Sequence, residues 1–79
     1  MLTAIHLETT GMFCPECPFR IESGIRRLKG VEHVVACRSL SLTSVLYDET
    51  VVNEAAIAGA IHDAGFAAHV IRRSQSGPA

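Results

Sequence analysis

Apolar and polar residues recur along the chain with two periods, and the change between them predicts where strands and helices lie. Ile5 and Leu7 alternate with polar neighbours, and this period of two is typical of a strand with one buried face. Ile21, Ile25 and Leu28 recur at the spacing of an amphipathic helix. Strands are expected over 5–10, 31–37, 42–47 and 66–71, and helices over 18–29 and 54–64.

Residues with special backbone roles mark the expected helix ends. Pro18 suits the first position of a helix, where its missing N–H is not needed. Gly30 is favourable directly after a helix, and Asn53 followed by Glu54 is typical of an N-cap and first turn. These positions agree with the periodicity.

The element order predicts an α+β fold. Strand, helix, strand, strand, helix, strand is the order of a ferredoxin-like βαββαβ sandwich, in which both helices cover one face of a four-stranded antiparallel sheet. The opposite face is expected to be open and unusually apolar, and to pack on another copy or on a neighbouring domain. The residues expected on this open face are His6, Val35, Cys37, Leu46, His69 and Ile71.

Composition and charge limit the classes of partner. The chain has 79 residues, of which 48% are hydrophobic and 19% charged, so it is expected to form one small globular domain over 1–71 with a flexible tail over 72–79. A formal net charge of −1 provides no basic field, so neither nucleic acid nor a membrane surface is an expected partner. The chain begins without a signal peptide, which predicts a cytoplasmic protein unless a leader or parent chain is missing.

Two of the three cysteines form a Cys-x-x-Cys motif on the predicted turn from strand to helix. Cys14 and Cys17 can direct both sulfurs to one point, where helix N–H groups and the helix dipole favour thiolates. Soft sulfur ligands select Cu(I), Hg(II), or Zn(II) with additional ligands. Because two sulfurs cannot complete a closed zinc site, the motif predicts an open site that suits handing a metal on.

In this framework the cysteine loop resembles the heavy-metal-associated domain family, which includes copper chaperones, metal-binding domains of P-type ATPases and mercury-binding proteins. The resemblance implies that Cys14 and Cys17 ligate the metal, while Met12 and Phe66 support the loop. It also implies that the chain is not an enzyme and that its partner is a metal-transporting P-type ATPase or another metal-transfer protein. The motifs that carry it are Gly11-Met12-x-Cys14-x-x-Cys17, Ile21-Glu22, Ile25, Gly30-Val31, Val45, Tyr47-Asp48 and Ala64-Gly65-Phe66.

The residues around the cysteines bear on which metal is bound. Pro15 and Glu16 are not the small or polar pair usual in copper chaperones, and Pro18 is similar to the mercury-binding branch. Glu16 places a carboxylate beside the thiolates, and zinc or cadmium would accept such an oxygen ligand. The softness of the two sulfur ligands nevertheless places monovalent copper first, with mercury, zinc and cadmium as alternatives.

The motif also fits a second class, the glutaredoxin-like thiol-disulfide oxidoreductases, which use Cys-Pro-x-Cys. Those proteins need a cis-proline facing the disulfide from a later strand, and neither Pro18 nor Pro78 is placed for that. Pro18 would also interrupt a redox helix that begins at the first cysteine. The metal hypothesis is preferred for these reasons.

The remaining candidate ligands form a weaker hypothesis. Cys37 is expected mainly as a small apolar residue of the fold. His6 and His69 are expected to be neighbours on the open face because the first and last strands pair, mostly as a coincidence of the surface. With Cys37 nearby, they would form a secondary metal site.

Overall fold

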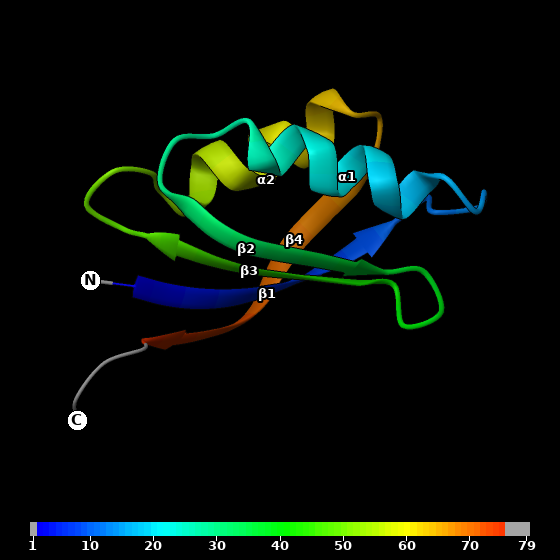
Figure 1. The fold of residues 1–79 in the computed structure, drawn as a ribbon. Helices are drawn as coiled ribbons and strands as arrows, with labels where there is room; N and C mark the ends of the chain where they lie inside the picture. The colour runs from blue at the N-terminus through cyan, green and yellow to red at the C-terminus, as the bar shows by residue number, and fades with distance from the viewer. Residues whose placement is uncertain (1, 76–79) are drawn as a thin grey trace.

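The computed structural model describes residues 2–75 and has the predicted order of elements (Figure 1). The α+β, ferredoxin-like prediction is confirmed, because two helices cover one face of a four-stranded antiparallel sheet with strand order β2-β3-β1-β4. No helix among the described residues is long and apolar enough to cross a membrane. The elements are β1 (Leu2–Thr10), α1 (Cys17–Arg26), β2 (Val31–Cys37), β3 (Leu42–Asp48), α2 (Glu54–Asp63) and β4 (Ala67–Gln75).

The core lies between the sheet and the helices and follows the predicted phasing. The inward positions of the strands and the apolar stripes of both helices are buried or partly buried, as periods of two and of about 3.6 residues predict. The apolar members of this core are Ile5, Leu7, Met12, Cys17, Ile21, Ile25, Val34, Val45, Tyr47, Val52, Ile57, Ile61 and Phe66.

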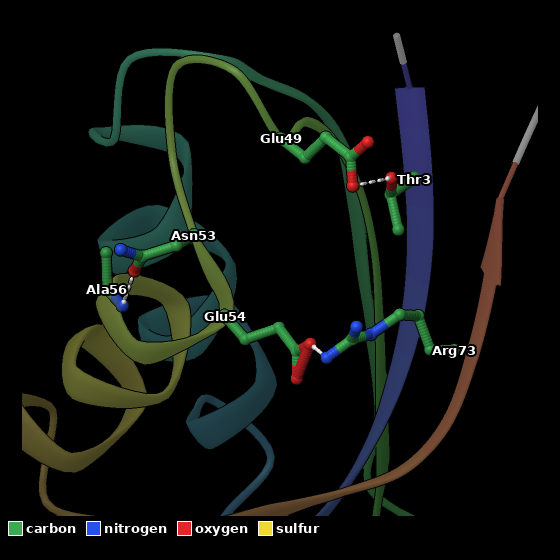
Figure 2. Close-up of polar contacts among 6 residues, drawn as sticks. All are labelled: Thr3, Glu49, Asn53, Glu54, Ala56 and Arg73. Carbon is green, nitrogen blue, oxygen red and sulfur yellow. Dashed lines mark hydrogen bonds and ion pairs between the residues drawn. The ribbon is translucent and has the colours of Figure 1, made fainter.

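The end of β4 differs from the prediction. The strand continues to Gln75, so residues 72–75 belong to the sheet and not to a tail; residues 76–79 lie outside the described part of the chain. The pairing register shifts between His6 and Leu7, where the alternation of β4 is interrupted. Arg73 consequently lies on the helix side of the sheet and forms an ion pair with Glu54 at the start of α2 (Figure 2).

The first helix begins one residue earlier than the expected 18–29, at the second cysteine of the motif, and it also ends earlier. α1 begins at Cys17, so Pro18 is the second helical residue instead of the first. The helix ends at Arg26, and Gly30 belongs to the following turn with φ of 99°. A side chain at Gly30 would place its Cβ 2.8 Å from Val51 Cβ, so this turn requires glycine for space as well as for its backbone conformation.

The N-cap predicted for the second helix is confirmed. The Oδ1 atom of Asn53 accepts a hydrogen bond of 2.8 Å from the N–H of Ala56, which satisfies one of the free donors in the first turn of α2 (Figure 2). Glu54 then places an acidic residue where the helix dipole favours it.

A carboxylate on α1 holds the free edge of the sheet. The Glu22 Oε2 atom accepts a hydrogen bond of 2.9 Å from the N–H of Ala36 on the edge strand β2. Arg26 lies beside the same carboxylate, with Nη2 3.9 Å from Oε1. An edge N–H that bonds a side chain is not available to another strand, and the bond fixes α1 on β2.

The open face does not form the continuous apolar surface that was expected. Val35 and Ile71 are 61% and 53% exposed, but they lie on β2 and β4, the two opposite edges of the sheet. The register places Ser44, His6 and Arg72 in a row beside Val35, and polar residues therefore cross the middle of the face. Ile71 is therefore separated from the other expected apolar residues, whereas Val35 and Cys37 share β2 and Leu46 lies on the neighbouring strand β3.

Candidate metal centre

The cysteine motif lies on the loop that joins the end of β1 to the start of α1. Gly11 opens the loop with φ of 101°, a backbone conformation that side chains rarely adopt. The N–H of Phe13 donates to the Gly11 carbonyl at 2.9 Å, which closes a tight turn immediately before Cys14. The loop thus owes its shape to its own backbone conformation and hydrogen bonding.

The structure brings Cys14 and Cys17 together. A disulfide joins them, their Cα atoms are 5.3 Å apart, and the N–H of Cys17 donates to the Cys14 carbonyl at 3.2 Å. Cys17 is buried and Cys14 is partly exposed, so the pair lies at the surface with one sulfur on the inner side. Once reduced, the same backbone presents two thiols at one point.

The electrostatic surroundings favour negative sulfur at this position. Cys17 is the first residue of α1, where the N–H groups of the first turn have no partner within the helix. No acidic residue lies in that turn, and Glu16 does not cap the helix with its side chain. The partial positive charge of the helix terminus is therefore available to thiolates.

Met12 and Phe66, the residues expected to support the loop, both belong to the hydrophobic core. Both side chains are buried, and Cys14 is among the partly buried residues that pack against the same core. A Cβ atom added to Gly11 would lie 3.4 Å from Phe66 Cδ1, so the ring lies directly against the start of the loop. Their packing links the loop to the core of the domain.

Two buried threonines, which the sequence did not single out, hold the base of the loop. The hydroxyls of Thr9 on β1 and Thr43 on β3 are 2.9 Å apart, and both residues are fully buried. The Thr9 N–H also donates to the carbonyl of Ser41 at 2.8 Å. Alternation placed Thr9 inward, but its cross-strand partner depends on the register.

The secondary ligands are not brought into one site. His6 Nδ1 lies 2.7 Å from Ser44 Oγ, whereas His69 Nε2 lies 3.6 Å from a carboxylate oxygen of Glu8. Cys37 is at the end of β2, on the far side of β3 from β1, and its sulfur is 3.3 Å from Ser39 Oγ. Among residues 2–75, no group of three or more His, Cys, Asp or Glu side chains could hold a metal ion.

The surroundings of Cys37 still affect its acidity. The hydroxyl of Ser39, followed by the backbone of Leu40, hydrogen bonds the sulfur and lowers the pKa of the Cys37 thiol below its usual value. Cys37 is nevertheless a free cysteine and takes no part in the disulfide between Cys14 and Cys17.

The cysteine pair lies apart from the hollow between the two helices. A surface hollow of about 610 Å³ lies between α1 and α2, and neither Cys14 nor Cys17 lines it. Small residues of both helices form part of its wall, including Gly24, Gly59 and Ala60. Phe13, Pro15 and Glu16 are exposed, so the cysteine loop lies at the surface, where another protein can reach it.

Comparisons with known proteins agree with this arrangement. The model of the family described as "Heavy-metal-associated domain" matches residues 8–67. A "Cation-transporting ATPase" of Oryza sativa subsp. japonica and the "Copper-transporting ATPase RAN1" of Arabidopsis thaliana are each 40% identical over 65 residues, covering 82% of this chain. The match covers only 6% of each of those two proteins.

Solved structures show the same fold. A copper-binding domain from a P-type ATPase has a TM-score of 0.87 and 28% identity, with 90% of this chain and 96% of that chain covered. The CopZ metallochaperone has a TM-score of 0.80 and 27% identity, with 84% and 98% covered. The match to the family model and the identity to these relatives show that the chain belongs to the heavy-metal-associated domain family.

Proposed function

We propose that this domain binds one soft metal ion through Cys14 and Cys17 and passes it to a partner protein by ligand exchange. The observation that supports this most directly is the convergence of two sulfurs at the N-terminus of α1, on an exposed loop. In this proposal the chain is a binding and transfer module, not an enzyme.

The donor set favours monovalent copper as the cargo. Two thiolates satisfy a soft ion of low coordination number, whereas zinc ordinarily takes four ligands and would need oxygen or nitrogen donors from elsewhere. Glu16 is the adjacent oxygen donor, so zinc and cadmium, together with mercury, are the competing ions. The relatives named above include a copper-transporting ATPase, a copper-binding domain and a metallochaperone, which also favours copper.

Transfer follows from the openness of the site. A thiol of the partner loses its proton and forms a third sulfur bond to the ion, after which the bond from Cys14 or Cys17 breaks. The released thiolate takes up a proton, and a second exchange completes the transfer. No step changes the oxidation state of the metal. In every intermediate at least two thiolates remain bound to the ion and compensate its positive charge.

The proposed partner is a metal-transporting P-type ATPase or another metal-transfer protein, and the proposed compartment is the cytoplasm. The chain spans about 6% of the ATPases it matches, so a free chaperone and a domain of a longer transporter are both consistent with it. In either case the exposed cysteine loop is the part that meets the partner.

A competition titration tests the proposed cargo. The reduced domain is titrated with Cu(I), Hg(II) and Zn(II) separately and in pairs, with thiol-to-metal charge-transfer absorption as the signal. We expect one soft ion per chain and retention of Cu(I) in excess Zn(II), because thiolates prefer the softer ion. Displacement of Cu(I) by equimolar Zn(II) would contradict the assignment of copper.

Oxidation of the cysteine pair is expected to abolish metal binding. The disulfide uses both sulfurs, so the oxidised domain offers no thiolate from the loop, and two-electron reduction should restore binding of one ion per chain. Metal uptake is measured before and after treatment with a dithiol reductant. Full uptake by the oxidised domain would exclude the loop as the site.

The same samples distinguish the glutaredoxin-like alternative. A redox enzyme should catalyse repeated reduction of a mixed disulfide with glutathione. We expect little turnover, because the cysteine pair lies in a heavy-metal-associated domain and its helix begins at the second cysteine, not the first. Sustained turnover without metal uptake would favour the redox function.

A further inference from the structure

Three exposed apolar side chains lie on the cysteine loop, on the first turn of the helix that follows it, and on the turn between β2 and β3. Phe13 is 90% exposed, Phe19 is 68% exposed and Leu40 is 70% exposed. Phe13 precedes Cys14, Phe19 lies in the first turn of α1, and Leu40 lies in the turn between β2 and β3. We call these three residues the apolar rim.

The fold brings the apolar rim to one end of the molecule. The turn that carries Leu40 is joined to the end of β1 by the hydrogen bond from Thr9 N–H to Ser41 O, at 2.8 Å. The cysteine loop begins immediately after β1, and Figure 1 shows this loop and the turn from β2 to β3 at the same end of the sheet. The three residues therefore belong to segments that meet at the end of the sheet where the metal site lies.

The apolar rim contributes little to the stability of the isolated domain. Each of its side chains remains largely in water, so the folded state gains almost none of the free energy that burial of a large apolar side chain supplies. Met12, in contrast, lies one residue before Phe13 and is buried in the core. Exposed apolar side chains grouped around a functional loop are typical of an interaction surface.

Ligand exchange determines what must cover this surface. Metal–sulfur bonds are about 2.3 Å long, so a partner's sulfur can reach an ion held by Cys14 and Cys17 only if the partner's own loop contacts this end of the domain. The exposed charges nearby have both signs, namely Glu16, Arg20 and Arg38, and they provide no field of a single sign.

We propose that the apolar rim docks on the apolar surroundings of the metal-binding cysteines in a second metal-binding domain. This proposal rests on the proposed function and adds the chemistry of the docking surface. Aromatic side chains that become buried between the two loops supply the contact, and the surrounding charges contribute little. A second copy of this chain is a partner of that chemistry and serves as the probe.

The experiment measures metal exchange between two copies. A ¹⁵N-labelled, Cu(I)-loaded domain is mixed with the unlabelled, reduced metal-free domain, and the second-order exchange rate is obtained from the amide signals of the cysteine loop. Variants carry Phe13→Ser, Phe19→Ser or Leu40→Ser in both copies, and Leu40 is especially informative because it lies outside the metal loop. Val35→Ser, which removes an exposed apolar residue of the open sheet face, is the matched control.

Each rim variant is expected to bind Cu(I) with unchanged stoichiometry and to slow exchange by about tenfold, the loss that corresponds to one large apolar contact. The Val35→Ser control should exchange at the wild-type rate. Raising NaCl from about 0.05 M to about 0.5 M should change the wild-type rate less than about twofold, since apolar contacts are not screened. Amide signals of residues 38–41 should shift on mixing.

Two outcomes overturn this proposal and are distinguishable. Normal Cu(I) uptake with unchanged exchange in all three rim variants, or a steep fall of the wild-type rate with salt, would exclude apolar docking while leaving the metal site intact. Absence of Cu(I) uptake by the wild type would instead overturn the proposed function, and the docking proposal with it.

Discussion

Replacing either cysteine of the loop with serine is expected to abolish the binding of a soft metal ion. Cys14→Ser or Cys17→Ser leaves one sulfur and a hydroxyl, and a hydroxyl is a poor ligand for Cu(I). The loss of affinity should exceed the roughly 10–100-fold effect of removing a partner that only orients a ligand. Competition against a chelator of known affinity measures it.

The third cysteine provides the matched control. Cys37→Ser should retain one tightly bound ion, because Cys37 hydrogen bonds Ser39 and lies outside the disulfide pair. Unchanged affinity in both loop variants would show that the site has been assigned to the wrong residues. Loss of binding in Cys37→Ser alone would show that this thiol participates.

Local sequence patterns were sufficient to predict most of the fold. Alternation and helical spacing identified the buried faces, and the amide of Asn53 predicted a cap that the structure contains. Position 71 was predicted wrongly as the end of β4, because a register shift opposite His6 and Leu7 interrupts the alternation that defines a strand in a sequence. The pairing of β4 with β1 nevertheless continues to Gln75. This continuation depends on the neighbouring strand and not on the local sequence of β4.

The cysteine pair was predictable for the same local reason, whereas the secondary site was not. Two cysteines three residues apart on one turn must lie close together, so the motif alone places their sulfurs. The proximity of His6 and His69 depends on the pairing of distant strands. The register pairs His6 with Arg72 and His69 with Glu8, which separates the two imidazoles along the strands.

The apolar rim shows a different limit of sequence reasoning. Phe19 is off the apolar stripe of α1, and its exposure agrees with helical spacing, whereas Phe13 lies in an aperiodic loop where no spacing predicts its exposure. An aromatic residue outside the helices and strands can equally be buried. Phe66, between α2 and β4, is such a residue. The distinction between the two rings needs the packed structure.

Truncating that buried ring is expected to have the largest effect on stability. Phe66→Ala removes a core side chain that contacts the start of the cysteine loop, and such changes lower the free energy of unfolding by about 3–5 kcal/mol. A domain of this size has only about 3–5 kcal/mol in total. The reduced, metal-free variant should therefore be largely unfolded, as measured by circular dichroism and urea titration.

Binding of the metal should partly restore the fold of this variant. A ligand that binds only the folded state adds about 2.7 kcal/mol when its free concentration is 100 times Kd, which is comparable with the expected loss. Cu(I) should therefore recover helical signal in Phe66→Ala, while Ile71→Ala, which truncates a residue that is 53% exposed, should remain folded without metal. If Phe66→Ala unfolds at the same urea concentration as the wild type, the ring does not support the loop, because a side chain that links loop to core cannot be removed without weakening both.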